Sequence, residues 1–425
     1  MKSIRKLPIY YGYIIVLMSI LAAVVTAPGQ TVGVSVYIDY FIKSFHLSRT
    51  ELSIAYMLGT IGSAMIIARV GVLIDKWGSR IIGFCTAILL GMTLIFFSQL
   101  DKFTFEKKYH IVIFLFVMVG FFALRFLAQG ALSLVSRTML LKWFVKLRGR
   151  MAAIVGVFTT LAMSASPPFF NWLISIYGWR TSYLIMGAII GIICALIFWL
   201  LFRNTPEECG LKPDGVKQNI AEDTEAEGYQ WSLSEARATY SFWVFNFCLS
   251  MYSFLFTAFT FHVTSIFGAV GLSRHAALTI FFPAACISVV IKLISGWLCD
   301  IEPWKSKLKY QLIMYLLSLF LLCIGILVLK NNILGRDLII VGMGIATGLF
   351  VTLSAVCWPL FYGRKFLGTI SGVNTAYRIF FSAIGPAFFA ISVTLTGAYT
   401  SAVLFCLVAI IMLLCFALKA DTPKK

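Results

Sequence analysis

Charged residues are scarce in this chain, and acidic residues are the scarcest of them. Only 12% of the 425 residues are charged, with 17 acids against 35 bases, whereas 60% are hydrophobic. An ordinary soluble domain has about twice that share of charged residues. The composition therefore excludes a typical soluble protein and indicates a chain buried in a membrane.

Patterns typical of enzymes and metalloproteins are missing as well. The ten cysteines are scattered singly with no CxxC spacing, which argues against a disulfide framework or a metal site. No nucleophile–base constellation, metal-ligand spacing or phosphate-binding loop appears. The sequence therefore predicts that the protein is not an enzyme and that it needs neither a cofactor nor a metal.

Long apolar runs fill most of the chain instead. A membrane-spanning helix needs roughly 20 mostly apolar residues, and the first run is too long for the core of a signal peptide. The sequence predicts an all-α membrane protein with twelve transmembrane helices. The runs lie near residues 11–33, 52–70, 81–99, 111–136, 150–173, 181–202, 241–266, 275–298, 310–329, 337–358, 366–393 and 400–418.

Many of the basic residues gather in alternate loops, although the net charge of +18 first suggests a nucleic-acid partner. Basic residues that follow alternate loops obey the positive-inside rule. We therefore expect no nucleic acid, and we place both termini in the cytoplasm and the protein in the cell (inner) membrane. These residues are Lys2, Arg5, Lys6, Lys76, Arg80, Lys142, Lys146, Arg148, Arg150, Lys305, Lys307, Lys309, Arg364, Lys365, Lys424 and Lys425.

A polar stretch over 204–239 divides the chain into two halves that resemble each other. It reads as a cytoplasmic linker, flexible in its middle, between six-helix bundles over 1–203 and 240–425. Parallel six-helix repeats are one architecture of transporters. The matching stretches are GVLIDKWGSR (71–80) with GWLCDIEPWK (296–305), RGRMAAIVGV (148–157) with GRKFLGTISGV (363–373), and GWRTS (178–182) with GAYTS (397–401).

The first of these stretches resembles the loop signature of the major facilitator superfamily, with Gly71, Asp75, Gly78 and Arg80 in place. The resemblance implies the major facilitator fold, with two six-helix pseudo-repeats. It also implies a gate in which Asp75 caps a helix start or pairs with a base, with Arg80 beside it. Asp300 ends the matching turn of the second half.

A second stretch, LRFLAQG (124–130), resembles the superfamily's helix 4 motif, in which an Arg is followed five residues later by Gly. This implies that Arg125 belongs to a buried network. Two readings of it stay open, a part in proton coupling and a purely structural role in holding helices together through carbonyl groups.

Five further stretches resemble the oxalate:formate antiporter and monocarboxylate porter group, whereas the GxxxGPxxGG motif of drug–proton antiporters is absent. The likeness implies transport of a small mono- or dicarboxylate. The stretches are TAPGQT (26–31), LKWFVKLRGRMAAIVG (141–156), YGWR (177–180), NTPEECGLKPDG (204–215) and FHVTSIFGAVGLSRHAAL (261–278).

Two cations inside apolar runs are the main candidates for substrate binding. Lys292 stands four residues before Gly296, where the resembling group carries a basic residue, usually Arg, that holds the substrate carboxylate. Arg378 stands six residues after Gly372, where the same group has a second basic residue, although the alignment can slip by one onto Tyr377. A charge at bilayer depth is costly and typically functional. The alternatives are a snorkelling Lys and an Arg that bonds neighbouring helices.

Other polar side chains in the apolar runs complete the predicted site. Gln30, Asn374 and Tyr377 are candidates for the wall of a substrate cavity. His262 lies toward the outer end of the seventh run, where it lines the outer mouth, carries a proton or simply forms hydrogen bonds.

The distribution of acids suggests how the carrier is driven. None of the 17 acids falls in the middle of an apolar run, Asp39 lies just past the first, and Ser288 stands where proton-coupled porters carry Asp. Leaving buried cations uncompensated is costly, so a bound anion is the expected partner of Lys292 and Arg378. This favours anion exchange, with proton-linked transport as the other option.

Two further hypotheses remain on the same residues. The fold can import an amino acid or a carboxylate-type siderophore, and a receptor that binds a metabolite without moving it is a remote alternative, because no signalling domain is present. The expected partners are the substrate, membrane lipid and protons, and the protein is expected to be monomeric.

Overall fold

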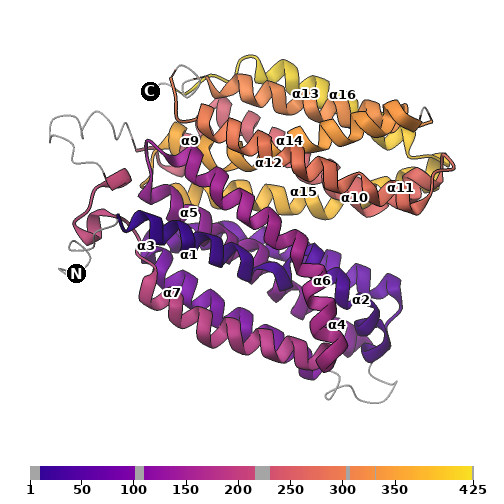
Figure 1. Ribbon diagram of the computed structural model, residues 1–425, viewed down its shortest axis with the longest axis horizontal. Helices are drawn as coiled ribbons and strands as arrows, with labels where there is room; N and C mark the ends of the chain where they lie inside the picture. Colours follow the sequence, from indigo (N-terminus) through magenta and orange to yellow (C-terminus); the bar gives the residue numbers. More distant parts are fainter. Residues whose placement is uncertain (1–9, 101–109, 216–229, 303–306, 331, 424–425) are drawn as a thin grey trace. The chain divides into compact units, whose positions relative to one another are not determined.

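The computed structural model describes all residues except 1–9, 101–109, 216–229, 303–306, 331 and 424–425. In the described part every regular element is a helix (Figure 1). The elements are α1 (Gly12–Val25), η2 (Ala27–Gly29), α2 (Thr31–Phe45), α3 (Arg49–Gln99), α4 (His110–Leu124), η5 (Arg125–Leu132), α5 (Ser133–Trp143), α6 (Arg148–Ala188), η6 (Ile189–Cys194), α7 (Ala195–Leu201), η7 (Glu207–Cys209), η8 (Pro213–Gly215), α9 (Leu233–Ala238), α10 (Tyr240–Gly268), α11 (Arg274–Thr279), α12 (Phe281–Leu298), α13 (Leu308–Leu327), α14 (Asn332–Tyr362), α15 (Leu367–Thr396) and α16 (Thr400–Ala417).

In the part of the chain that the structure describes, ten helical stretches are long and apolar enough to cross a membrane. Two of them are double. The stretch 51–99 is broken at Gly78 (φ 84°) and the stretch 148–201 at Gly178 (φ 75°). Positive φ is the conformation that glycine adopts without strain, so each break is a turn between two spans. Ten stretches with two double ones make twelve spans, and the predicted all-α membrane fold is confirmed.

The first span differs from its expected bounds. It runs from Gly12 to Phe45 and is interrupted by the 3₁₀ turn η2 at Ala27–Gly29, where Pro28 occupies the start of the turn. A proline removes a backbone donor and breaks a regular helix. Asp39 therefore lies inside helix α2 rather than past the span, and the expectation that no acid falls in the middle of a helix is wrong at this position. The Asp39 side chain is exposed.

The chain divides into two compact units. Unit 1 comprises Met1–Val145, Phe158–Ala226 and Lys365–Ala376, and unit 2 comprises Lys146–Val157, Glu227–Arg364 and Tyr377–Lys425. The beginnings of α6 and α15 thus each belong to the unit opposite to the rest of the helix. The reason is the set of contacts that the start of each helix makes, which are described below. The predicted division at 203 and 240 stays a prediction.

Within unit 1, α3 packs against α4, η5, η6 and α7, and α1 packs against α5. Small residues allow the closest approaches. A Cβ added to Gly91 in α3 would lie 2.5 Å from the Gly187 carbonyl oxygen and 2.5 Å from the Gly191 Cα. Apolar helices in a membrane gain little from hydrophobic burial and associate through such close packing.

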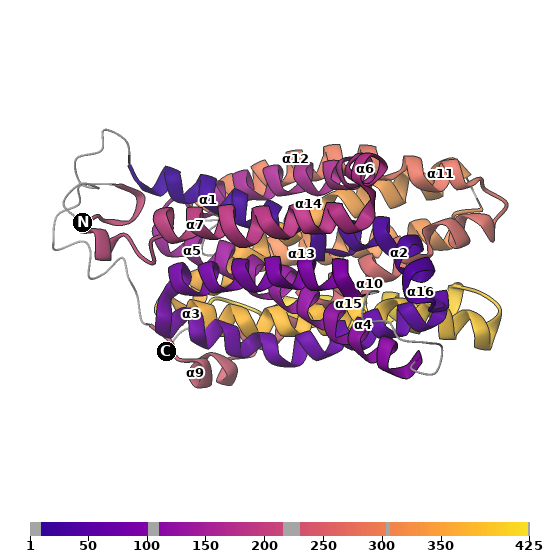
Figure 2. The same cartoon turned by 90° about the horizontal axis from the view of Figure 1, so that it is seen from below.

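Within unit 2, α14 packs against α12 and α13, and α16 packs against α13 and α10. These helices run roughly alongside one another in both views (Figures 1 and 2). The polar segment before α10 ends in α9, which a capping box of Ser232 and Glu235 begins. The predicted flexible middle of the linker lies outside the described residues.

We predict opposite effects for two Gly-to-Ala substitutions. Gly91→Ala places a methyl group against backbone atoms and should lower the free energy of unfolding by about 1–3 kcal/mol. A Cβ added at Gly268 would have no neighbouring atom within 4 Å. Gly268→Ala should therefore be neutral or slightly stabilising, because Ala favours helix more than Gly. Thermal unfolding of the purified protein in one detergent measures both. Equal melting temperatures would contradict the packing described for α3.

Candidate functional site

Lys292 is buried within helix α12. Its side chain is fully shielded, and it lies six residues before Leu298, which is about 9 Å along the helix. Ser288, one turn earlier on the same helix, is also buried. Gly156 allows a close approach to Val351 beside the lysine stem, because a Cβ there would lie 2.7 Å from Val351 Cγ1 and at an ordinary contact distance of 3.7 Å from Lys292 Cδ.

Arg378 lies half-buried in α15 and stacks on an aromatic side chain of α14. Its guanidinium carbon is 4.5 Å from the centre of the Phe350 ring. Phe350 is stacked in turn on Tyr252 of α10, with ring centres 4.1 Å apart. The Tyr252 hydroxyl bonds to Thr347 Oγ1 at 2.9 Å. The cation therefore rests on an ordered aromatic stack that belongs to unit 2.

The two cations meet the same part of helix α14. Arg378 lies against Phe350, whereas the Lys292 stem and Val351 border the same point at Gly156. Consecutive residues of a helix differ in height by about 1.5 Å. Lys292 and Arg378, which both belong to unit 2, therefore lie at a similar level of α14. Chemically, this arrangement can attract an anion with one carboxylate or two.

The other two candidates of α15 have different surroundings. Asn374 is fully buried in the segment of unit 1 that packs near Gly71 of α3. Tyr377 belongs to unit 2, where its ring lies against Trp243 and Phe247 of α10, with ring centres 6.1 and 6.0 Å away. The ring of Tyr377 thus packs among aromatic residues.

Arg125 holds the broken part of the first span. It is 1% exposed and begins the π-helical segment η5. Its Nη1 group donates to the Gly29 carbonyl oxygen at 3.2 Å and to Thr31 Oγ1 at 3.3 Å, and its guanidinium lies over the Tyr56 ring. These bonds fit the structural reading of Arg125, which joins helices through a carbonyl group.

Gln30 stands between the same 3₁₀ turn and helix α2. Its backbone is extended, and its Nε2 group donates to Thr26 Oγ1 at 3.1 Å. The side chain is half-buried. Gln30 therefore has a local hydrogen bond at the break of the first span, next to the groups that Arg125 binds.

His262 bonds to two neighbouring segments. Its Nε2 atom is 3.0 Å from the Pro386 carbonyl oxygen of α15, and its Nδ1 atom is 3.3 Å from the hydroxyl of Tyr399. Because a carbonyl can only accept, Nε2 carries the proton, and in the neutral ring Nδ1 accepts from Tyr399. This geometry fits the hydrogen-bonding interpretation of His262.

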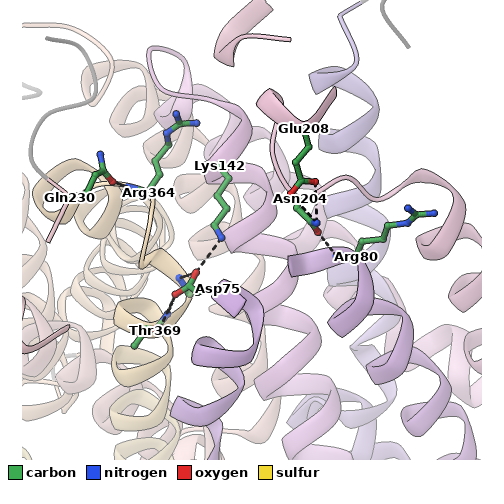
Figure 3. A network of polar contacts seen from close by, with 9 residues as sticks. Asp75, Arg80, Lys142, Asn204, Glu208, Gln230, Arg364 and Thr369 are labelled. Atoms are coloured by element: carbon green, nitrogen blue, oxygen red, sulfur yellow. Dashed lines mark hydrogen bonds and ion pairs between the residues drawn. The ribbon is translucent and has the colours of Figure 1, made fainter. Parts of the chain in front are cut away.

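Asp75 binds the first turn of helix α15. Its carboxylate accepts from the Gly368 amide at 3.0 Å, from the Thr369 amide at 2.6 Å and from Thr369 Oγ1 at 2.8 Å. Lys142 adds an ion pair at 3.2 Å (Figure 3). The first N–H groups of a helix lack partners within the helix, so Asp75 both caps a helix start and pairs with a base.

Asp300 repeats this arrangement at helix α6. It accepts from the Gly149 amide at 2.7 Å and from the Arg150 amide at 2.9 Å, and the Arg150 guanidinium lies 3.6 Å away. Burial raises the pKa of the Asp300 carboxyl, while the two amides and the neighbouring arginines lower it. The echo between the two halves of the sequence thus corresponds to two copies of one contact.

Both capped helix starts approach a partner helix through glycine. A Cβ on Gly71 would lie 2.1 Å from the Gly368 carbonyl oxygen, and a Cβ on Gly149 would lie 2.2 Å from that of Gly296. We call the Asp75–Gly368–Thr369 and Asp300–Gly149–Arg150 contacts the two acid caps. They explain why the beginnings of α15 and α6 group with units 1 and 2 respectively.

Arg80 anchors the loop beside the first acid cap. Its Nε group donates to the Trp199 carbonyl oxygen at 2.7 Å and its guanidinium lies over the Trp199 ring, while its amide donates to Asn204 Oδ1 at 3.0 Å. A similar amide contact ends the linker in unit 2, where Gln230 accepts from the Arg364 amide at 2.8 Å (Figure 3).

Sequence reasoning missed three partners of the site. Lys142 was counted only as a loop charge, Thr369 only as part of a repeat, and Phe350 not at all. The repeat did hold a usable signal, because its second pair of stretches begins the two helices that Asp75 and Asp300 cap. Among the described residues no group of three or more His, Cys, Asp or Glu could hold a metal.

Comparison with known proteins defines the family. A family model described as Major Facilitator Superfamily matches residues 14–386. No curated protein matches the sequence significantly. Among solved structures, the chain is similar to the MFS proton:xylose symporter XylE bound to 6-bromo-6-deoxy-D-glucose, with a TM-score of 0.66 and 14% sequence identity, over 96% of this chain and 94% of that chain. This identity shows a shared fold alone.

We predict that removing each acid cap loosens only its own helix start. Asp75→Ala should speed hydrogen exchange of the Gly368 and Thr369 amides by about 10-fold or more, because each loses a bond to a charged acceptor worth about 1.5–3 kcal/mol. Asp300→Ala should do the same at Gly149 and Arg150. Exchange mass spectrometry of the purified protein measures both segments.

The control is Asp421→Ala, which removes an ion pair of Lys309 with an exposed carboxylate and should leave both helix starts unchanged. If Asp75→Ala leaves exchange at 368–369 as in the unaltered protein, the cap is not what holds α15.

Proposed function

Because the chain belongs to the major facilitator superfamily, it is a multi-pass membrane transporter and not an enzyme, and we propose that it carries a small organic anion, a mono- or dicarboxylate. We further propose that it resides in the cell (inner) membrane with both termini in the cytoplasm, on the side where the positive-inside rule puts the basic loops. The two acid caps then lie at the cytoplasmic ends of the spans.

The observation that carries this proposal is the pair of cations at one level of α14. Lys292 is fully buried and Arg378 half-buried within apolar spans. In unit 2 the described spans contain a single acid, Asp337, which lies 13 residues from Phe350 and pairs with Arg336. Such a region is strongly positive, so it favours an anion over a neutral or cationic ligand.

The two cations differ in how they can hold a carboxylate. Lys292 is a point charge on a flexible stem, whereas the flat guanidinium of Arg378 can make two parallel bonds. Stacking on Phe350 fixes the plane of Arg378. We therefore propose that Arg378 orients one carboxylate and that Lys292 neutralises it or a second acidic group.

The acid caps suggest the gate of the transport cycle. Each cap joins the start of one helix to the end of another through a buried carboxylate and a glycine contact. Breaking a cap exposes helix-start amides, which water can satisfy but the bilayer cannot. We propose that both caps open when the cytoplasmic side opens, and that Arg80 keeps the adjoining loop in place.

We propose that coupling follows from the cost of removing water from the two cations when no anion is bound. A carrier whose cations lose water without a bound anion passes through an unfavourable occluded state, so exchange of one anion for another is favoured. Proton-linked transport is the second mode, with the proton on the substrate or on His262. Arg125 is proposed to keep the first span broken in both states, and Gln30, Asn374 and Tyr377 to line or support the cavity.

Other ligands of the same fold would differ in how they use the two cations and in whether they are transported. An amino acid or a carboxylate-type siderophore would use the same cations together with further polar contacts. A neutral sugar, the cargo named for XylE, would not need them. A receptor without transport would bind the ligand and show no flux. A thermal-shift screen with mono-, di- and tricarboxylates, amino acids and xylose ranks these ligands before any flux is measured.

We predict that Lys292→Gln nearly abolishes uptake of the anion that the screen identifies. Losing one partner of a buried charge pair costs about 2 kcal/mol or more, so uptake at low substrate should fall about 30-fold or more in proteoliposomes. Lys330→Gln, at an exposed turn of unit 2, is the control and should transport normally. Unchanged uptake by Lys292→Gln at equal protein incorporation would sink the assignment of this residue.

We also predict that exchange outpaces net flux. Proteoliposomes loaded with unlabelled anion should take up labelled anion about tenfold faster than empty ones, because the empty carrier must close around Lys292 and Arg378 without the charge of a bound anion. A protonophore should leave this exchange unchanged. Net uptake that equals exchange and disappears with the protonophore would replace the exchange mechanism by proton symport.

A further inference from the structure

A long apolar groove runs along the outside of unit 2. It encloses about 470 Å³ between helices α10, α15 and α16, and its lining is almost entirely carbon. None of the predicted substrate-binding residues is among those that line it. The groove is therefore separate from the place where Lys292 and Arg378 lie.

The lining residues form one stripe on each of two spans. Helix α10 contributes Tyr240, Trp243, Phe247 and Met251, and α16 contributes Phe405, Ala409, Met412 and Phe416. Residues spaced by three and four share one face of a helix. Phe405 is 55% exposed and Phe416 is 52% exposed, so the groove opens outward, and in a membrane-spanning segment its surroundings are lipid rather than water.

The groove has the length of one lipid leaflet. From Phe405 to Phe416 helix α16 rises about 17 Å, and half of the hydrocarbon core of a bilayer is about 15 Å. Tyr240 begins the span of α10, and Phe416 lies one residue from the end of the span of α16. The groove thus starts at one boundary of the membrane and ends near its middle.

Amphipathic and basic residues mark the mouth of the groove. The Tyr240 hydroxyl donates to the Phe416 carbonyl oxygen at 3.0 Å, and the Trp243 Nε1 group donates to the Arg237 carbonyl oxygen at 2.8 Å. Tyr and Trp favour the membrane–water interface. The exposed side chains of Arg237 and Lys419 follow directly outside the two spans.

The nearby acids are already occupied. The carboxylate of Asp421 pairs with Lys309 at 2.5 Å, and Glu235 bonds to the amide and hydroxyl of Ser232 in the cap of α9. Basic residues just outside the membrane on a span attract anionic headgroups. The positive charge at the mouth matches an anionic lipid headgroup, and the apolar length beneath it matches an acyl chain.

We propose that this groove is a binding site for an anionic phospholipid, with one acyl chain between α10 and α16 and the headgroup at Arg237 and Lys419. The site also reaches the transport machinery. Trp243 and Phe247 form the wall of the groove and pack against Tyr377, the neighbour of Arg378. An acyl chain on this wall restrains the segment of α15 that carries the cation.

Native mass spectrometry of the full chain tests the site without any substrate. Delipidated protein is titrated with phosphatidylglycerol and, separately, with phosphatidylcholine of the same chains. We expect one tightly retained phosphatidylglycerol per chain. Ala409→Phe should fill the groove and reduce this retained lipid about tenfold, whereas Val408→Phe, on an exposed face of α16 outside the groove, should retain it.

A second variant tests the headgroup. Arg237→Gln with Lys419→Gln leaves the groove open and should bring phosphatidylglycerol down to the retention of phosphatidylcholine. Equal retention by Ala409→Phe and Val408→Phe, or equal retention of the two lipids by the unaltered protein, overturns the proposal. A dimer that Ala409→Phe dissociates overturns it as well and assigns the groove to a second copy of the chain.

Discussion

The cost of charge in hydrocarbon is the constraint on which this structure depends. A charged group at bilayer depth is costly unless it is hydrogen-bonded, paired or hydrated. The chain meets the constraint differently for its two signs of charge. Buried carboxylates are placed at helix starts, where the backbone amides have no acceptor within the helix, as Asp75 and Asp300 show. Buried guanidinium groups are placed on aromatic rings, as Arg125 and Arg378 show.

The two solutions differ in how easily they can be undone. An acid cap consists of a few bonds at one helix start, and water can replace all of them once that end opens. A guanidinium that stacks on a ring has no such substitute within the bilayer, so it remains in the protein throughout a transport cycle. The acids are therefore suited to a gate that opens and closes, and the cations to a site that a ligand visits.

The sequence could predict what depends on local patterns. Apolar length predicted the twelve spans, and the glycines at 78 and 178 account for the two tight turns between them. It could not predict that Pro28 would divide the first span without ending it. A proline ends some helices and only interrupts others, and the sequence does not distinguish the two cases. This is why Asp39 was expected in a loop and lies in a helix.

Long-range partners were out of reach for a different reason. Asp75 and Thr369 are 294 positions apart, and nothing in the composition of either stretch encodes their contact. Only the repeat linked them, since Asp300 and Gly149 stand in corresponding places. The aromatic support of Arg378 left no such trace, because a Phe in a run of apolar residues looks the same whether it faces lipid, a neighbour or a cation.

Helix α15 is the element in which these features meet. Its first turn is held by Asp75, its middle carries Arg378, Phe381 belongs to the outer groove, and Pro386 accepts a bond from His262. A helix transmits a displacement along its axis because its backbone bonds resist stretching, but a proline weakens that ladder at one point. Release of the cap is therefore expected to move the residues from Leu367 to Arg378 together, while the part beyond Pro386 stays with His262. On this account the segment between the cap and the proline is the moving part, and the lipid-facing wall against Tyr377 is the place where the membrane can influence it.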